Sequence, residues 1–425
     1  MSHIEDHPLR YELSNELHTR PFPSMTAPGT VVFLALKQSL DIGRDADAER
    51  ALLINLLDHF GSKHPKPDAT HYSGTLGKYY LKWEQHTEFV TYTLFCDGLS
   101  ERAFDPADFE AFPVDWMVSI DHLRMTSLVM RVEPRTSDIE IKEKVHDWFV
   151  PESLALSAML DGAVIGGGDF RIDAAGHLRF ALFVGNGMGR RRVGRVVQRI
   201  CEIETYKTMS MLGFAKAKEM AADLNRNGAE LTALISQLPE AGHGADAALN
   251  ALLKVTAELE SLSANSAYRF AATKAYEAIV NQRIEVLREE RFQGRQTFRE
   301  FMMRRYDPAM RTVKSTEERL SAMTNRATRA GNLLRTRVDV ERSAQNQSLL
   351  ESMDRRADLQ LRLQKTVEGL SVVAISYYAV SLAEYLIHPF AAVLGIPKGT
   401  LTSAVTLPIF LMVWWAIRRI RARME

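Results

Sequence analysis

The chain of 425 residues predicts an α+β protein with an N-terminal α/β sheet domain, a long helical stalk and a C-terminal two-helix transmembrane hairpin. Short β-rich runs separated by turn residues fill residues 28–188, which indicates a sheet. Helical periodicity then extends over 189–369, and two apolar segments lie within 370–417. Residues 1–27 are expected to form an N-terminal arm, and residues 418–425 a basic tail.

Composition places the chain among folded proteins. Hydrophobic residues make up 46% and charged residues 25%, which excludes disordered and collagen-like chains. The formal net charge is zero, so the chain as a whole is not a polyelectrolyte. Two cysteines in this length exclude a disulfide scaffold, and Cys96 and Cys201 are expected to be reduced thiols.

The sheet domain is predicted from β-rich runs bounded by turn residues. The segment from 75 to 95 is expected to form two strands around a turn at Glu84–His86, and Asp45–Phe60 has the apolar spacing of a helix. Because the strands come partly in hairpins, the sheet is expected to be antiparallel or mixed. The other predicted strands are Val31–Leu36, Leu123–Val132, Ala163–Ile172 and Leu178–Val184.

Prolines divide the region after the sheet into three helical stretches, at 190–237, 246–306 and 309–388. If the last helix continues unbroken to the membrane near Lys365, it is about 85 Å long. Apolar or small residues recur along it at steps of three and four, as in a coiled-coil seam, with one interruption at Thr316. Two interpretations stay open: the seam joins copies of the chain, or it packs on the two preceding helices. The seam residues are Val313, Leu320, Met323, Ala327, Ala330 and Leu334.

Two apolar segments near the C-terminus are predicted to cross a membrane. Leu370–Leu394 is almost free of charge and is long enough to span a hydrocarbon core of about 30 Å. Leu401–Ile417 carries no charge and is near the lower limit of length for a span. The N-terminus has acidic residues and no apolar run, so no signal peptide is expected, and the chain before Leu370 is expected in the cytoplasm.

Charges beside the two segments predict their orientation. Basic residues precede the first segment and follow the second, whereas the intervening loop holds only Lys398. By the positive-inside rule, both termini are expected in the cytoplasm, as in a multi-pass protein of the bacterial inner membrane. Trp414 and Trp415 would then lie at the cytoplasmic interface, which indoles prefer. The flanking basic residues are Arg355, Arg356, Arg362, Lys365, Arg418, Arg419, Arg421 and Arg423.

Glu384 is the most informative residue of the first segment, because a carboxylate inside a span costs about 2.5–3.5 kcal/mol. The candidate pore-lining residues Tyr377, Ser381, Glu384 and His388 follow at steps of four, three and four, so their side chains share one helix face. Such a stripe is typical of a pore lining, of hydrogen bonds between subunits or of a proton relay. The alternative is that Glu384 and His388 lie at the level of the lipid headgroups, beside Pro389.

Three glycines, Gly185, Gly187 and Gly189, follow a predicted strand and open a helix that begins with three arginines. Backbone amides and arginines in this arrangement can hold a phosphate or another anion, and the alternative is an ordinary tight turn. The spacing matches neither a dinucleotide fingerprint nor a P-loop.

No further pattern points to catalysis or to a metal site. The twelve histidines lack metal-ligand spacing and no nucleophile elbow is present, so no cofactor is expected and the protein is expected not to be an enzyme. Residues 286–342 are basic, but acidic residues interleave and no aromatic platform accompanies them, so nucleic acid is not an expected partner. The expected partners are the lipid bilayer, other copies of the chain and, for a pore, a metal ion.

Three stretches resemble a family of bacterial membrane proteins of unknown function. They are HPLRYELSNELHTRPF at 7–22, RVVQRICEIETYKTM at 195–209 and VEGLSVVAISYYAV at 367–380. The resemblance extends over nearly the whole chain and implies no particular activity.

The order of the parts also resembles the CorA-type magnesium channels. That resemblance implies a homopentamer whose stalk helices line a pore, with cytoplasmic metal sites that gate it. The family's Gly-Met-Asn signature is absent, because the corresponding stretch reads HPFAAVLGIPKGT, so no site residue is carried over. Two membrane helices cannot enclose a pore alone, so the expected function is ion transport by a homo-oligomer. The alternative is a membrane-anchored cytoplasmic scaffold or sensor.

Overall fold

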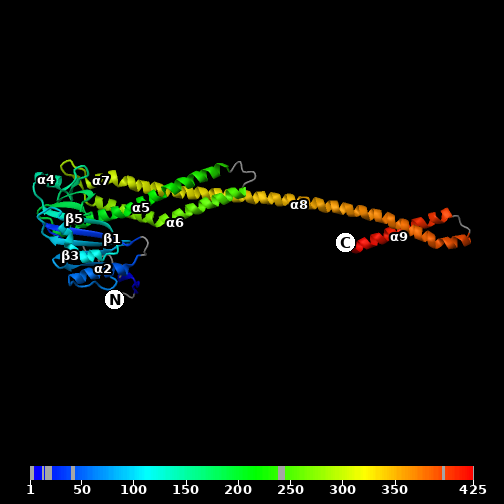
Figure 1. Ribbon diagram of the computed structural model, residues 1–425, viewed down its shortest axis with the longest axis horizontal. Coiled ribbons are helices and arrows are strands. Elements are labelled where there is room, and N and C mark those ends of the chain that lie inside the picture. Colours follow the sequence, from blue (N-terminus) through cyan, green and yellow to red (C-terminus); the bar gives the residue numbers. More distant parts are fainter. Residues whose placement is uncertain are drawn as a thin grey trace. The chain divides into compact units, whose positions relative to one another are not determined.

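The computed structural model describes residues 4–11, 14, 22–39, 44–237, 245–394 and 398–424. The chain forms two compact units. The first unit consists of Met1–Pro239 and Asn250–Ala330, and the second of Glu240–Leu249 and Gly331–Glu425. The predicted α+β class is confirmed, because a nine-stranded sheet and long helices precede two C-terminal apolar helices that fit a hairpin (Figure 1).

The described strands form one sheet in the order β2-β3-β4-β1-β5-β8-β7-β6-β9. Neighbouring strands are antiparallel except β5 and β8, which are parallel, so the prediction of an antiparallel or mixed sheet is confirmed in its mixed form. The strands are β1 (Gly29–Lys37), β2 (His71–Leu76), β3 (Tyr79–Gln85), β4 (Val90–Asp97), β5 (Leu123–Pro134), β6 (Ala155–Met159), β7 (Val164–Ile172), β8 (Leu178–Val184) and β9 (Glu290–Arg291).

The sheet contains strands that the sequence does not predict. Residues 71–97 form three strands, because Gly77 has a φ of +60° and allows a two-residue turn between β2 and β3. The turn predicted at Glu84–His86 lies slightly later, since β3 continues to Gln85 and β4 begins at Val90. Strands β6 and β9 are also absent from the prediction.

The predicted helix over 246–306 is wrong in its last third. Helix α6 (Ala245–Glu285) is followed by β9, which pairs with β6 at the edge of the sheet, and then by α7 (Phe298–Arg305). Gly294 has a φ of +73° and Arg288 a φ of +48°, and neither conformation fits a continuous right-handed helix. No proline marks this break, so the sequence carries little local signal for it.

One face of the sheet is covered by four helical elements that share a hydrophobic core with it. Alternate residues of each strand point to this face, so Leu81 and Trp83 of β3 join Leu53 and Leu56 in the core. All four side chains are fully buried, and each contributes about 2 kcal/mol of transfer free energy. The helical elements are α2 (Ala46–His59), η1 (Pro106–Ala111), α3 (Val114–Val118) and α4 (Asp138–Trp148).

Helix α5 (Arg190–Gln237) lies against the opposite face of the sheet and continues beyond it, beside α6 and the start of α8 (Asp307–Leu394) (Figure 1). Two polar contacts show how these helices join in the first unit. Lys274 Nζ of α6 lies 3.1 Å from Glu317 Oε2 of α8. Arg319 Nη1 of α8 donates to Asn225 Oδ1 of α5 at 2.9 Å.

The six predicted seam residues of α8, from Val313 to Leu334, are all buried within the single chain. Met323 lies beside Gly228 of α5, where a Cβ atom would be 3.4 Å from the Met323 methyl group. These six residues are therefore covered within the chain, and at Met323 the seam packs on α5.

The second unit contains the end of α8 and helix α9 (Lys398–Met424), which folds back along it (Figure 1). Two helical segments among the described residues, Asp307–Ile387 and Thr402–Ile420, are long and apolar enough to cross a membrane by length and composition. Residues 395–397, part of the HPFAAVLGIPKGT stretch between the two apolar segments, lie outside the described residues.

Candidate functional site

The polar stripe predicted from the sequence lies on α8. Tyr377 and Glu384 are exposed and Ser381 is half-buried, and the Ser381 hydroxyl donates to the Tyr377 carbonyl of its own helix at 3.0 Å. Glu384 Oε1 accepts a hydrogen bond from Thr402 Oγ1 of α9. The backbone of His388 belongs to α8, but its side chain lies outside the described side chains. Two of the polar groups therefore already have partners within the hairpin.

The Thr402 contact indicates where Glu384 lies along the apolar segments. Thr402 lies four residues after Lys398, where α9 begins. Glu384 lies ten residues before Leu394, where α8 ends. The bond thus joins Glu384, within the apolar run at 370–394, to the first turns of α9.

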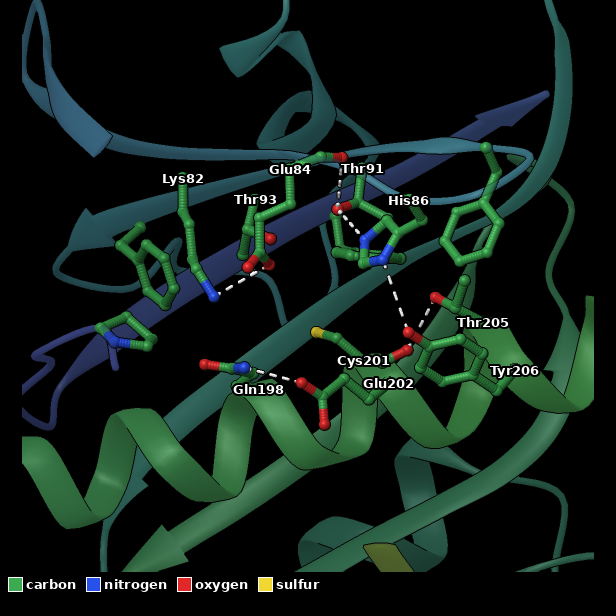
Figure 2. A pocket seen from close by; sticks show the side chains of 14 residues that line it. Lys82, Glu84, His86, Thr91, Thr93, Gln198, Cys201, Glu202, Thr205 and Tyr206 are labelled. Carbon is green, nitrogen blue, oxygen red and sulfur yellow. Dashed lines mark hydrogen bonds and ion pairs between the residues drawn. The ribbon is translucent and has the colours of Figure 1, made fainter. Parts of the chain in front are cut away.

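A second candidate site lies between the sheet and α5 (Figure 2). The empty space between its walls is about 380 Å³. The volume open to the centre of a water molecule is only about 20 Å³. Strands β1, β3 and β4 form one wall, α5 forms the other, and Pro23 of the arm closes one end. The cavity is therefore narrow, with room for water or a small group.

The sheet wall of this cavity is polar although α5 covers it. Because side chains alternate along a strand, Lys82 and Glu84 of β3 point away from the core that holds Leu81 and Trp83. Strands covered on both faces are usually apolar throughout. From the sequence alone, this alternation indicates a face exposed to water, which is why the prediction missed the site.

Two charged side chains form an ion pair inside the cavity. Lys82 Nζ lies 2.9 Å from Glu84 Oε2, and their side chains are 5% and 13% exposed. The geometry is too bent for a hydrogen bond, and Lys82 Nζ has no hydrogen-bond acceptor among the described residues. A buried ammonium with unmet donors is costly, so this lysine is suited to an additional acceptor.

On the opposite wall, α5 presents Gln198, Cys201 and Glu202 to the cavity (Figure 2). Gln198 Nε2 donates to Glu202 Oε1 at 2.6 Å, and Glu202 also pairs with Arg283 of α6. Burial raises the pKa of the Cys201 thiol well above its usual range. This thiol is therefore neutral at physiological pH and a poor nucleophile.

Aromatic rings close the far end of the cavity. His86 stacks on Phe89 with ring centroids 4.3 Å apart and lies edge-on to Tyr206 of α5. Its Nε2 is 3.2 Å from Thr91 Oγ1 and its Nδ1 is 3.4 Å from Tyr206 Oη (Figure 2). These contacts fix the β3–β4 turn against α5.

Glu88, in the same turn, ties the sheet to α6. Its carboxylate accepts two hydrogen bonds from Arg269, at 2.9 and 2.6 Å, and one from Tyr276 Oη at 2.8 Å, with Lys37 Nζ 3.3 Å away. Burial alone would raise the pKa of this carboxyl, but the bonds from Arg269 and Tyr276 and the nearby cations bring it below its usual value.

A family model described as "Protein of unknown function (DUF3422)" matches residues 5–424. The chain belongs to the DUF3422 family. A search of curated proteins found no match, and neither did a search of solved structures.

The DUF3422 match covers the elements around the cavity and both apolar helices. One of the stretches that carry the resemblance, 195–209, supplies all the α5 residues that line the cavity. They are Gln198, Cys201, Glu202, Thr205 and Tyr206. The family description assigns no activity, so function is inferred from the geometry.

A cleft adjoins the cavity and shares Pro23, Lys82 and Phe95 with it. The empty space of this cleft is about 1160 Å³. The volume open to the centre of a water molecule is about 470 Å³. Gly194 of α5 lets the arm form its rim, because a Cβ atom there would lie 1.9 Å from the Pro23 carbonyl oxygen. This cleft is large enough for a small molecule.

The sequence predicts no metal site from the spacing of its histidines. Among the described residues, no group of three or more His, Cys, Asp or Glu side chains is arranged to hold a metal ion. His64, between α2 and β2, lies 2.6 Å from Asp58.

Proposed function

We propose that this DUF3422 protein is a membrane-anchored cytoplasmic sensor, in which the C-terminal hairpin is an anchor and the first unit binds a ligand. The observation that carries this proposal is the hydrogen bond from Thr402 to Glu384. It gives the one carboxylate of the apolar segments at 370–394 and 401–417 a partner inside the hairpin. An anchor needs no further partner for this residue, whereas a pore needs the carboxylate to face an axis shared by several copies.

The proposed topology has both termini on the cytoplasmic side. Basic residues flank the hairpin at both cytoplasmic ends, as the positive-inside rule requires. Arg418 and Arg419 lie over the rings of Trp414 and Trp415, at 5.1 and 4.9 Å from the ring centroids. Arginine and tryptophan together are typical of a membrane–water interface, which supports this end of α9 as the cytoplasmic one.

Single cysteines test the topology in a chain whose two native cysteines are replaced by alanine. Asn55→Cys lies on the exposed surface of α2, and Gly399→Cys is exposed at the start of α9. With a membrane-impermeant maleimide, we expect Gly399→Cys to react in spheroplasts and Asn55→Cys only in inverted vesicles. Labelling of both cysteines from the same side would contradict a two-span hairpin.

Ion transport by a homo-oligomer is the second candidate. The observation that favours it is the exposure of Glu384 and Tyr377, which leaves part of the polar stripe available to other copies of the hairpin. In this proposal Tyr377, Ser381, Glu384 and His388 line a pore for a metal cation, in an assembly similar to the CorA-type channels. It requires Glu384→Gln to change the ion flux, whereas the anchor does not.

A further inference from the structure

The cleft beside the cavity is strongly basic. Four cationic side chains line it: Lys78, Lys82, Arg190 and Arg191. Asp97 is the one carboxylate among its lining residues, all of which are described. The hydroxyl-bearing residues Ser24, Ser73 and Thr75 lie around the same cleft.

The exposed cations of the basic cleft have no counter-charge of their own. Lys78, Arg190 and Arg191 form no ion pair with a carboxylate of the described residues. Surface cations usually occur interspersed with acidic residues, so three unpaired cations around one concave surface create a positive field within it. That field favours a negatively charged occupant.

The first turn of α5 adds to this field. The turn carries three consecutive arginines and no acidic residue. The positive end of the helix dipole lies there, and cations at this end are unfavourable by several tenths of a kcal/mol each. An anion in the cleft would interact favourably with this end of the helix, where the amides of Arg192 and Val193 already donate to the Gly189 carbonyl.

Lys82 supplies an independent reason for a ligand. Its side chain is 95% buried, its ammonium pairs with Glu84 but makes no hydrogen bond to a described residue, and it borders both the cavity and the basic cleft. An acceptor oxygen in the cleft would satisfy its unmet N–H donors. Neither the helix terminus nor the exposed arginines explain why a charged lysine is kept at this position.

We infer that the basic cleft binds a phosphate-bearing anion, held by Lys82 from the sheet and by Arg190 and Arg191 from α5. This inference rests on the proposed sensor function, because it names the ligand class of the first unit. Arginine forks and lysine match phosphate oxygens in charge and geometry. The phosphate can belong to a soluble compound or to a phospholipid headgroup, and the volume of the cleft accommodates either polar group.

The test uses the full-length protein in nanodiscs of phosphatidylcholine, at low ionic strength. Inorganic phosphate is titrated in one arm and dihexanoylphosphatidylglycerol, a soluble lipid with a phosphate headgroup, in the other, both by calorimetry. We expect the double variant Arg190→Gln/Arg191→Gln to bind at least about a hundredfold more weakly, since it removes two charged hydrogen-bond donors to the anion. Both side chains are exposed, so this variant is expected to fold.

Arg192→Gln is the matched control. Arg192 lies in the same helix turn and is also exposed, but it does not line the cleft, so this variant is expected to bind as the native chain does. A second pair, Lys82→Gln/Glu84→Gln, removes the buried ion pair as a whole and is also expected to weaken binding.

Binding of inorganic phosphate that depends on Arg190 and Arg191 supports a soluble ligand. Binding of the lipid alone, with the same dependence, supports the inference with a headgroup as the source. No binding in either arm, or equal binding by the double variant and by Arg192→Gln, overturns it. The cysteine labelling is independent of this result, so failure of the anion site leaves the anchored topology separately tested.

Discussion

At the scale of single residues, Glu88 has the most extensive set of partners in the first unit. It receives hydrogen bonds from Arg269 and Tyr276 and lies near Lys37, and its side chain is 5% exposed. Removing one partner of such a buried group leaves the remaining charges uncompensated. This cluster therefore holds the β3–β4 turn, and with it the wall of the cavity, against α6.

Glu88→Gln is expected to lower the free energy of unfolding by about 3 kcal/mol at neutral pH, because Arg269 would lose its counter-charge. The pKa of Glu88 lies below its ordinary value of 4.5, so its stabilisation is complete above that value and is lost as the pH falls through the lowered pKa. The difference between the variant and the native chain should therefore shrink on acidification. Thermal unfolding followed across pH measures this difference.

Glu110→Gln is the control for this prediction. Glu110 is exposed, so its replacement is expected to change stability little at any pH. An equal loss of stability in both variants, or a loss in Glu88→Gln that does not depend on pH, would show that the Glu88 cluster is not ionised as described.

At the scale of elements, the close approach of α5 and α6 depends on Gly213. A Cβ atom at this position would lie 2.2 Å from Thr273 Oγ1 and 2.9 Å from Thr273 Cβ. At Gly228 on the same helix, the nearest atoms would be 3.4 Å away, which is an ordinary contact. The two glycines therefore have different roles in one helix.

Gly213→Ala is expected to lower stability by about 1–3 kcal/mol, because the helices must separate to admit the methyl group. Gly228→Ala is expected to leave stability unchanged or to raise it by up to about 1 kcal/mol through higher helix propensity. Unfolding midpoints of the two variants, compared with the native chain, measure the contrast. Equal midpoints for both variants would mean that α5 and α6 do not pack at Gly213.

The sequence allowed prediction of those elements whose signal is local. The apolar spans and the helical periodicity that follows the sheet lie in consecutive residues, and so does the run Val31–Leu36 in β1. The break after Glu285 was missed because the backbone turns at Arg288 and Gly294 without a proline. The cavity was missed because the burial of Lys82 is set by α5, more than a hundred residues later in the chain.

For the polar stripe of α8, too, the sequence predicts the helix but not the contacts of its side chains. Spacing correctly places Tyr377, Ser381 and Glu384 on one helix, but it does not reveal that Thr402 is the partner of Glu384. The sequence indicates the glycine-rich turn before α5 as a candidate anion site, whereas Lys78 and Lys82 of the proposed site come from the distant β2–β3 turn and from β3. Contacts between distant segments decide the site, and periodicity does not report them.

At the scale of the whole molecule, we propose that a hairpin anchor is combined with a ligand-binding unit. The two apolar segments supply the lengths that a bilayer requires, and the first unit supplies the basic cleft. The coiled-coil seam predicted on α8 is occupied by helices of the same chain. An oligomer, if one forms, must therefore use other surfaces than these six residues.

The most direct test of the anchor is a flux measurement on the purified full-length protein in liposomes, driven by a cation gradient and a membrane potential. The account predicts fluxes of magnesium and of monovalent cations equal to those of protein-free liposomes, for the native chain and for Glu384→Gln alike. A flux above that of protein-free liposomes that Glu384→Gln reduces would contradict the anchor and establish the pore.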